Sequence, residues 1–280
     1  MNDQAYRLRQ MAAQSRRPVE HQGRPGTPTL VFGSGKGGVG KSVVAIAAAT
    51  RLAESGAKVL LLDGDFNLAN LHLLLGVEPV ARIETLLHGD ARPEDLVIAV
   101  HQNLWVLPGD SGGEQLHTLG TVDKARLFHR LTGVSDQYDV VVVDAGAGIE
   151  SVVRCCAVPS AHPIIVTVPE PAALADAYAV IKIINFQAGH VPVTVLVNRV
   201  DSDAQGRAAF ERLEVASQRF LQEPLNYLGA VPEDELLRRA VREASPFWLG
   251  DTPLVRSIKE HIDHGRALFG LDAPAAAGTG

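Results

Sequence analysis

Hydrophobic residues in this chain gather in short, nearly continuous runs that alternate with longer amphipathic segments. Seven of the runs are rich in β-branched residues: TLVFG, KVLLLD, LWVLPG, YDVVVVD, PIIVTV, VTVLVN and YLGAV. Such runs are typical of strands in a parallel sheet that helices cover on both faces. The segments between them predict helices over residues 40–55, 123–135, 149–157, 173–188, 205–221, 234–243 and 253–268. This alternation predicts an α/β fold with a doubly wound, mostly parallel sheet flanked by helices.

The two ends of the chain differ in composition from this alternating part. Residues 14–28 are rich in Arg, Gln, Gly and Pro and lack apolar periodicity, which predicts a flexible linker. The last ten residues, LDAPAAAGTG, predict a disordered tail. We therefore expect a flexible arm over residues 1–28, one domain over 29–270 and a tail over 271–280.

Composition and charge narrow the class of protein. With 280 residues and 46% hydrophobic content, the chain can bury a sizeable core. The formal net charge is −6, but the first 26 residues carry five arginines against two acidic residues, so the body is more acidic than the whole. An acidic body argues against a protein that coats nucleic acid, and we expect no direct nucleic-acid binding.

The sequence predicts a cytoplasmic location. No apolar run approaches the roughly 20 residues that span a bilayer, and the N-terminus lacks the apolar stretch of a secretory signal. Cys155 and Cys156 are neighbours, which suits a reducing compartment and predicts buried helix packing in preference to a redox pair.

The stretch SGKGGVGKS lies between the first predicted strand and the first predicted helix. Gly35-x-x-x-x-Gly40-Lys41-Ser42 satisfies the phosphate-loop pattern in the strand–loop–helix context that the pattern requires. Its glycines let successive backbone N–H groups turn towards phosphate oxygens, and the following helix points its positive end at them. We expect Lys41 to neutralise the β and γ phosphates and Ser42 to ligate Mg²⁺.

The same letters also match a dinucleotide-binding fingerprint. Gly33-x-Gly35-x-x-Gly38 has the required spacing, and Asp63 lies about where an acidic ribose ligand would fall. This alternative leaves Lys41 and Ser42 unexplained, so the phosphate loop is the favoured interpretation.

GKGGVGKS as a whole resembles the deviant Walker A motif of the MinD/ParA family of ATPases. The resemblance implies a P-loop NTPase fold, ATP and Mg²⁺ as cofactors, and an ATP-dependent homodimer. It implies that Lys36 contacts the partner's nucleotide across the dimer interface, and that Lys36 and Lys41 are both catalytic. The alternative for Lys36 is a solvated lysine on a turn. The nucleotide-binding residues that it implies in the loop are Gly35, Lys36, Gly37, Gly38, Val39, Gly40, Lys41 and Ser42.

Carboxylates end two of the predicted strands. VLLLDGD ends with Asp63 and Asp65, and YDVVVVD ends with Asp144. Acidic residues at the carboxyl ends of parallel strands lie where such sheets bind ligands, although aspartates also cap helices. The family resemblance implies that Asp65 orients or activates the attacking water. It places Asp63 in the outer Mg²⁺ shell and Asp144 on Mg²⁺ through water.

The segment after Asp144 departs from the family pattern. Many members have Thr or Pro after this aspartate, whereas this chain has Ala145-Gly146-Ala147-Gly148. We expect Gly146 and Gly148 to let this segment, which corresponds to switch II, respond to the γ-phosphate.

Later strand ends predict the base site. VTVLVNRV ends a strand at Asn198, whose amide can both donate to and accept from adenine. In the family, the loop after a later strand surrounds the base. In this chain that loop lies in GAVPEDELL, so Pro232 and Asp234 are candidate base-binding residues. A strand-end Asn is otherwise a common turn residue.

The second half of the chain is similar to one group within the family, the flagellar-number regulators FlhG, also called FleN. The resemblance covers roughly residues 29–250, including ANLHLLLG and LNYLGAVPEDELLRRAVREASPF. It implies control of flagellar number and placement, through the GTPase FlhF and candidate partners among flagellar basal-body proteins or a flagellar transcription regulator.

The first residues match an element found in that group. The pattern DQAxxLR contributes the candidate partner-binding residues Asp3, Gln4, Ala5, Leu8 and Arg9. In the group this element docks on FlhF and stimulates GTP hydrolysis. Asp3 is a good helix N-cap, and a segment this short would order on its partner. The alternative is an amphipathic leader without a partner.

Residues 253–269 predict an amphipathic helix. Leu254, Ile258, Ile262 and Phe269 fall near one face. The family resemblance implies contact with the inner face of the cell membrane in the ATP dimer, and core packing is the alternative. His261 and His264 lack an evident third metal ligand, so the helix surface is the favoured place for them.

Two other functions are compatible with the same residues. One is a MinD-like or ParA-like ATPase that positions the division site or the chromosome. The other is an adaptor that binds nucleotide without hydrolysing it.

Overall fold

The computed structural model describes residues 26–271 except 67, 68, 80, 82, 90, 110–115, 117, 159, 189, 190 and 244. Its centre is an eight-stranded sheet in the order β3-β4-β2-β5-β1-β6-β7-β8. The strands are β1 Thr29–Gly33, β2 Val59–Asp63, β3 Ile98–His101, β4 Leu104–Leu107, β5 Val140–Asp144, β6 Ala161–Thr167, β7 Val193–Val200 and β8 Leu225–Pro232. Neighbouring strands are parallel except for the β3–β4 pair.

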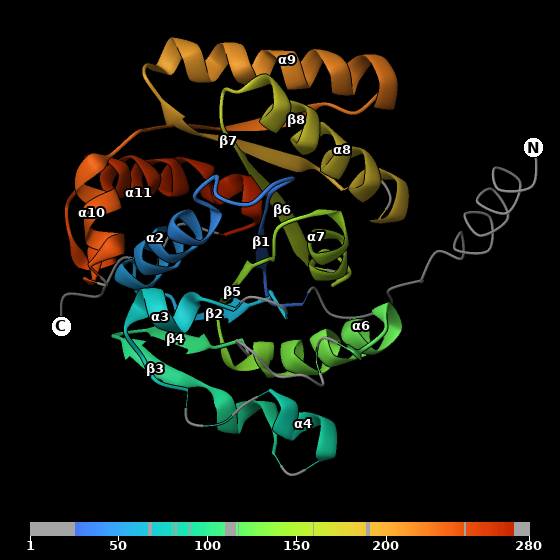
Figure 1. Ribbon diagram of the computed structural model, residues 1–280, viewed down its shortest axis with the longest axis vertical. Coiled ribbons are helices and arrows are strands. Elements are labelled where there is room, and N and C mark those ends of the chain that lie inside the picture. The colour runs from blue at the N-terminus through green and yellow to red at the C-terminus, as the bar shows by residue number, and fades with distance from the viewer. Residues whose placement is uncertain are drawn as a thin grey trace, which may run out of the picture.

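Helices cover both faces of this sheet (Figure 1). One core cluster packs α2, α3, α10 and α11 on the sheet, and the other packs α4, α6, α7, α8 and α9. The helices are α2 Lys41–Glu54, α3 Leu71–Leu75, α4 Glu84–His88, α6 Thr121–Leu131, α7 Ile149–Cys155, α8 Pro171–Ala188, α9 Asp203–Leu221, α10 Glu235–Arg242 and α11 Pro253–Gly265. Short 3₁₀ turns span Pro93–Leu96, Thr132–Gln137, Phe247–Leu249 and Arg266–Phe269.

Strand β2 shows why the strands are apolar throughout. Val59 and Leu61 belong to one core cluster, whereas Leu60 and Leu62 belong to the other. Successive side chains of a strand point to opposite faces, and here both faces are covered, so every position is buried. The predicted α/β fold is therefore confirmed.

Three elements were not predicted: strand β3 and helices α3 and α4. Strand β3 lies at the edge of the sheet, and its four residues are alternately half-buried and exposed. Helices α3 and α4 have five residues each, too few to show a helical period.

The domain boundaries predicted at both ends need correction. Thr27 Oγ1 donates to the Ser135 carbonyl at 3.0 Å, and the Pro28 carbonyl accepts from Val141 N at 2.9 Å, so both residues are part of the folded body. Leu271 is buried in the core, so the body also extends past residue 270. The predicted partner-binding residues Asp3, Gln4, Ala5, Leu8 and Arg9 lie outside the described residues.

Helix α11 packs in the core, which corrects the expected membrane helix over residues 253–269. Leu254, Ile258 and Ile262 are at most 3% exposed. Two ion pairs fix the helix to α2: Lys259 Nζ lies 2.8 Å from Glu54 Oε1, and Arg51 Nη2 lies 2.7 Å from an oxygen of Asp263. The core-packing alternative therefore describes this helix. Across the part of the chain that is described, no helix has both the length and the apolarity of a membrane span.

Candidate functional site

The loop from Ser34 to Gly40 leads from β1 into α2 and leaves open space above its middle. A Cβ atom added at Gly37 or Gly38 would meet no heavy atom within 4 Å. Gly38 and Gly40 have φ angles of 80° and 90°, a region that favours glycine. Gly35 packs so closely on the backbone of Asp176 in α8 that no side chain fits there. The loop therefore has the open, glycine-lined form that an anion requires.

Lys41 and Asp144 form an ion pair at the bottom of this loop. The Lys41 ammonium donates to Asp144 Oδ1, and the side chains are only 11% and 3% exposed. Burial raises the pKa of Asp144, whereas Lys41 and the Ser42 side chain lower it, so the three side chains are electrostatically coupled.

Asp63 lies beside Asp144 because the two residues are register partners in the parallel strands β2 and β5. Burial and the neighbouring Asp144 raise the pKa of Asp63 to about 7. Its carboxylate accepts from Asp65 N at 3.0 Å and from Asn70 N and Leu71 N at 3.1 Å. Two of these amides lie at the start of α3, so Asp63 also caps that helix, and its place in the outer Mg²⁺ shell stays a prediction.

Asp65 lies against the segment that follows β5. A Cβ atom at Gly146 would lie only 2.8 Å from Asp65 Cγ, so a glycine is needed there for the two segments to touch. Gly148 N donates to the Ser34 carbonyl at 3.1 Å, which ties the same segment to the phosphate loop. Glycines thus allow segments 64–66 and 144–148 to pack together beside the loop.

Lys36 does not point at its own loop's glycines but forms an ion pair with Glu170. Its Nζ lies 2.8 Å from Glu170 Oε2, and the two side chains are 37% and 64% exposed. Lys36 also lowers the pKa of Glu170 through this bond. The lysine is therefore at the surface and engaged within its own chain.

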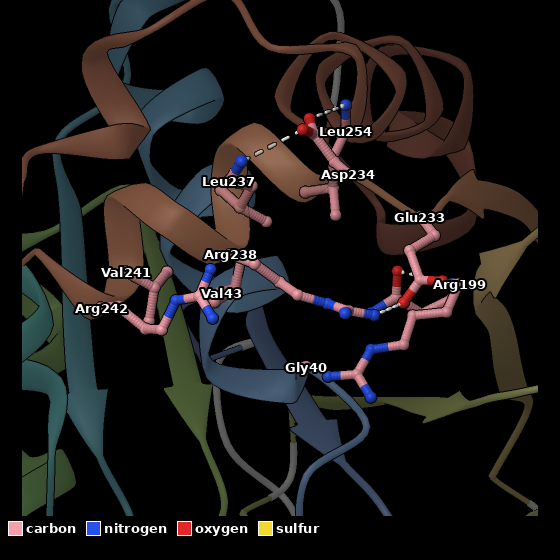
Figure 2. Close-up of a pocket in the computed structure, with 11 residues that line it drawn as sticks. Gly40, Val43, Arg199, Glu233, Asp234, Leu237, Arg238, Val241, Arg242 and Leu254 are labelled. Atoms are coloured by element: carbon pink, nitrogen blue, oxygen red, sulfur yellow. Dashed lines mark hydrogen bonds and ion pairs between the residues drawn. The ribbon is translucent and has the colours of Figure 1, made fainter.

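A cavity of about 270 Å³ adjoins the loop (Figure 2). Gly40 of the loop and Val43 of α2 form part of its wall. Apolar Leu237, Val241 and Leu254 line it together with three arginines, Arg199, Arg238 and Arg242. An apolar cavity next to a phosphate loop, with charged groups at its rim, has the character of a site for a nucleotide base.

Two of the three residues predicted to contact the base line this cavity, but their polar atoms face the protein. Asn198 Nδ2 donates to the Val39 carbonyl at 2.8 Å, and its Oδ1 accepts from Arg199 N. The Asp234 carboxylate accepts from Leu237 N and Leu254 N, which caps α10 and anchors α11. Pro232 does not line the cavity. Asn198 and Asp234 therefore brace the walls of the cavity, and their direct contact with a base stays a prediction.

The sequence patterns did not single out Glu170 or the arginines of the cavity. Glu170 directly precedes α8, and Arg238 and Arg242 lie in the RRAVR segment of α10. Arg199 follows Asn198 and has a φ angle of 56°, which turns the chain at the cavity. For Arg238 and Arg242 the sequence did offer one signal, the run of charged residues after β8. Such a run is by itself typical of a solvated helix face.

The side chains fit a Mg²⁺ site that a bound phosphate completes. Ser42, Asp63 and Asp144 offer oxygen donors, which Mg²⁺ prefers, and it usually takes only one or two carboxylates beside phosphate oxygens and water. No group of three or more His, Cys, Asp or Glu side chains that could hold a metal occurs among the described residues. His261 Nε2 instead lies 2.8 Å from the Ala230 carbonyl, between α11 and β8.

Comparison with known proteins places this chain among nucleotide-binding domains. Residues 30–247 match the CobQ/CobB/MinD/ParA nucleotide binding domain. The antiactivator FleN of Pseudomonas aeruginosa is 35% identical over 209 residues, which cover 75% of each chain. The flagellum site-determining protein YlxH of Helicobacter pylori is 36% identical over 244 residues, covering 87% of this chain and 82% of YlxH.

Solved structures agree with the fold. The septum site-determining protein MinD of Pyrococcus horikoshii, complexed with Mg-ADP, has a TM-score of 0.68 and 26% identity and covers 88% of this chain and 99% of its own. A chain of the MinC:MinD cell division protein complex of Aquifex aeolicus has a TM-score of 0.67 and 29% identity, and the match covers 88% of this chain and 97% of that one. Residues 30–247, which match the family, contain the glycine loop, both strands that end in an aspartate and most of the residues that line the cavity. The chain belongs to the CobQ/CobB/MinD/ParA family of nucleotide-binding domains.

Proposed function

We propose that this protein is a Mg²⁺-dependent ATPase switch that dimerises when it binds ATP. The observation that carries the proposal is the meeting of Lys41, Asp63 and Asp144 at the foot of an open glycine loop. An adaptor that only bound nucleotide would need the loop and Lys41. It would not need a third carboxylate, Asp65, beside them, so hydrolysis is favoured over a scaffold role.

Each side chain has a separate task in this proposal. Backbone N–H groups of residues 35–42 bind the phosphates of ATP, and Lys41 transfers its hydrogen bond from Asp144 to a phosphate oxygen. Ser42 and Asp144 would hold Mg²⁺, which would neutralise charge on the phosphates. Asp65 accepts a hydrogen bond from the attacking water and orients it towards the γ-phosphorus.

Lys36 makes the dimer dependent on nucleotide. Its side chain lies at the protein surface, where it can leave Glu170 and contact the phosphates of a second copy. Two protomers that face each other across their loops then each supply one positive charge to the partner's ATP. Loss of the γ-phosphate removes the attraction and returns monomers.

The test of hydrolysis is Mg²⁺-dependent phosphate release by the wild type and by Asp65→Asn. We expect the substitution to reduce kcat by about 100-fold or more, because the water loses its acceptor. Asp136→Ala, at an exposed aspartate, is the matched control and should turn over ATP like the wild type. Equal background turnover in the wild type and Asp65→Asn would exclude the switch mechanism.

We also propose that the switch controls flagellar number or placement. Support comes from two relatives whose names concern flagella, FleN and YlxH, each at least 35% identical over three quarters of this chain or more. Asp3, Gln4, Ala5, Leu8 and Arg9 would form the arm that stimulates the GTPase FlhF, as the resemblance of the first residues implies. Septum-positioning ATPases are the competing assignment, because MinD proteins are also similar to this chain.

A peptide of residues 1–20 separates these two assignments. Titrated into FlhF, it should raise the rate of GTP hydrolysis, and a matched peptide with Leu8→Ala and Arg9→Ala should not. Absence of stimulation by the native peptide would remove the main reason to prefer flagellar control over septum positioning.

A further inference from the structure

Arg154 is a buried arginine on α7 that reaches across to the segment after β2. The residue is 8% exposed. Its Nη2 donates to the Gly64 carbonyl at 2.9 Å and to Ser151 Oγ at 2.9 Å. Its guanidinium also lies over the Phe66 ring, with Cζ 4.8 Å from the ring centroid. One side chain therefore holds both neighbours of Asp65.

The environment of Arg154 is unusual for a buried cation. Among the described residues, no carboxylate forms an ion pair with Arg154, and its Nε has no hydrogen-bond partner. A buried charge with unused donors is costly to the fold, and a neutral side chain of similar volume would avoid that cost. Apart from its bond to Ser151 on its own helix, the polar and ring contacts of Arg154 all go to segment 64–66.

Two further contacts show that segment 64–66 is fitted against α7 and the residues before it. A Cβ atom at Gly64 would lie 2.8 Å from Cys155 Sγ, so α7 packs directly on the Gly64 backbone. A Cβ atom at Gly146, on the segment that leads into α7, would lie equally close to Asp65 Cγ. The chain on either side of Asp65 thus has its position set by α7.

We infer that Arg154 is a positioning residue that fixes Asp65 relative to α7, so that a movement of the 144–148 segment also moves the water-orienting carboxylate. The inference rests on the proposed ATPase function. Gly148 N is bonded to the Ser34 carbonyl, so a ligand on the phosphate loop is mechanically connected to α7. Arg154 carries that connection onwards to the Gly64 carbonyl and the Phe66 ring.

Substitution of Arg154 by Met and by Lys tests the inference. Arg154→Met fills a similar volume but has no donor and no charge. We expect its kcat to fall about 10- to 100-fold, since a misplacement of about 1 Å can cost that much, while ATP affinity stays within about threefold. Arg154→Lys keeps one donor for the Gly64 carbonyl and loses the planar stack, so its kcat should be intermediate. Arg207→Met is the matched control, because Arg207 stacks on Tyr227 with Cζ 4.4 Å from the ring, far along the chain in α9.

Hydrogen exchange of the nucleotide-free protein gives a readout that does not depend on hydrolysis. Arg154→Met should exchange faster than the wild type in peptides that contain residues 64–66 and equally in peptides from residues 34–42. If the wild type does not hydrolyse ATP, the proposed function fails, and the exchange difference alone still decides the role of Arg154. The inference is overturned if exchange at 64–66 is unchanged. It is also overturned if kcat stays within about twofold of the wild type, or if kcat and ATP affinity fall in the same proportion as the folded fraction.

Discussion

Lys36 and Glu170 form an ion pair between the phosphate loop and the residue that precedes α8, with 2.8 Å between Nζ and Oε2. Both side chains are partly exposed, so the pair contributes little to the stability of the fold. The pair matters for dimerisation. Lys36 is proposed to bind the partner's nucleotide, but in this structure it is bound to Glu170 of the same chain. ATP-dependent association therefore competes with this contact.

Glu170→Gln should make dimerisation easier. Removal of the carboxylate charge frees Lys36. Because the pair is exposed and its contribution is small, the dimer dissociation constant should fall by no more than about fivefold. Analytical ultracentrifugation with a non-hydrolysable ATP analogue, over a series of protein concentrations, measures this constant. The difference from the wild type should shrink as salt is raised. A weaker dimer in Glu170→Gln would show instead that Glu170 belongs to the dimer interface.

Asn198→Ala should weaken the binding of any ligand that occupies the phosphate loop. The substitution leaves the Val39 carbonyl without the donor that braces it, a loss of about 1–3 kcal/mol, so affinity should fall about 5- to 150-fold. Calorimetric titration with Mg-ATP and with Mg-tripolyphosphate separates the two roles of this residue. Equal losses for both ligands indicate bracing, whereas a loss confined to ATP would show that Asn198 is a base ligand.

The parts of the fold that depend on local pattern were predictable from the sequence. Apolar runs such as VLLLD identify buried parallel strands because both of their faces are covered. The edge strand β3 gives no such run, since only half of its residues turn towards the protein. Helices α3 and α4 are too short for periodicity to reveal them.

The site was predictable where its chemistry lies in one continuous stretch. The loop 35–42 carries its spacing in the sequence, and strand ends placed Asp63 and Asp144 at one edge of the sheet. Contacts between distant residues were not predictable: Lys36 and Glu170 are 134 positions apart, and Asn198 and Val39 are 159 apart. Sequence spacing fixes which groups are available, whereas packing decides that Asn198 binds the loop backbone.

Ile258→Ala tests whether α11 is part of the core. Ile258 is fully buried between α11 and its neighbours, so the truncation should lower the free energy of unfolding by about 2–4 kcal/mol. Urea unfolding of the full chain measures it. Leu268→Ala is the matched control, because Leu268 is 44% exposed and should cost no more than about 0.5 kcal/mol. Equal small effects of the two substitutions would mean that α11 is not held in the core and would reopen the membrane interpretation.

His162 should make the protein less stable as the pH falls below its ordinary pKa of 6.5. The ring lies beside Phe269, and burial lowers the pKa of His162 in the folded chain. At a pH between the lowered pKa and 6.5, His162 is protonated in the unfolded chain and neutral in the folded chain. The free energy of unfolding is therefore highest above pH 6.5 and declines below it.

His162→Gln removes this contribution. The urea midpoint of the wild type relative to His162→Gln should therefore be higher at pH 7.5 than at pH 5.5. Because the comparison is between two proteins at the same pH, the opposite contribution of Asp63, whose pKa is raised, cancels. A difference between the two midpoints that does not change with pH would show that His162 titrates alike in the folded and unfolded chains.

The most direct test of ATP-dependent dimerisation is the mass of the protein in solution. Light scattering measures this mass for the wild type and for Lys36→Ala in the presence of Mg²⁺ and a non-hydrolysable ATP analogue. We predict that the wild type shifts from monomer to dimer. Lys36→Ala should remain a monomer while it binds the analogue with nearly unchanged affinity, because Lys36 pairs with Glu170 and not with its own loop. A wild type that stays monomeric, or a Lys36→Ala variant that still dimerises, would contradict the account.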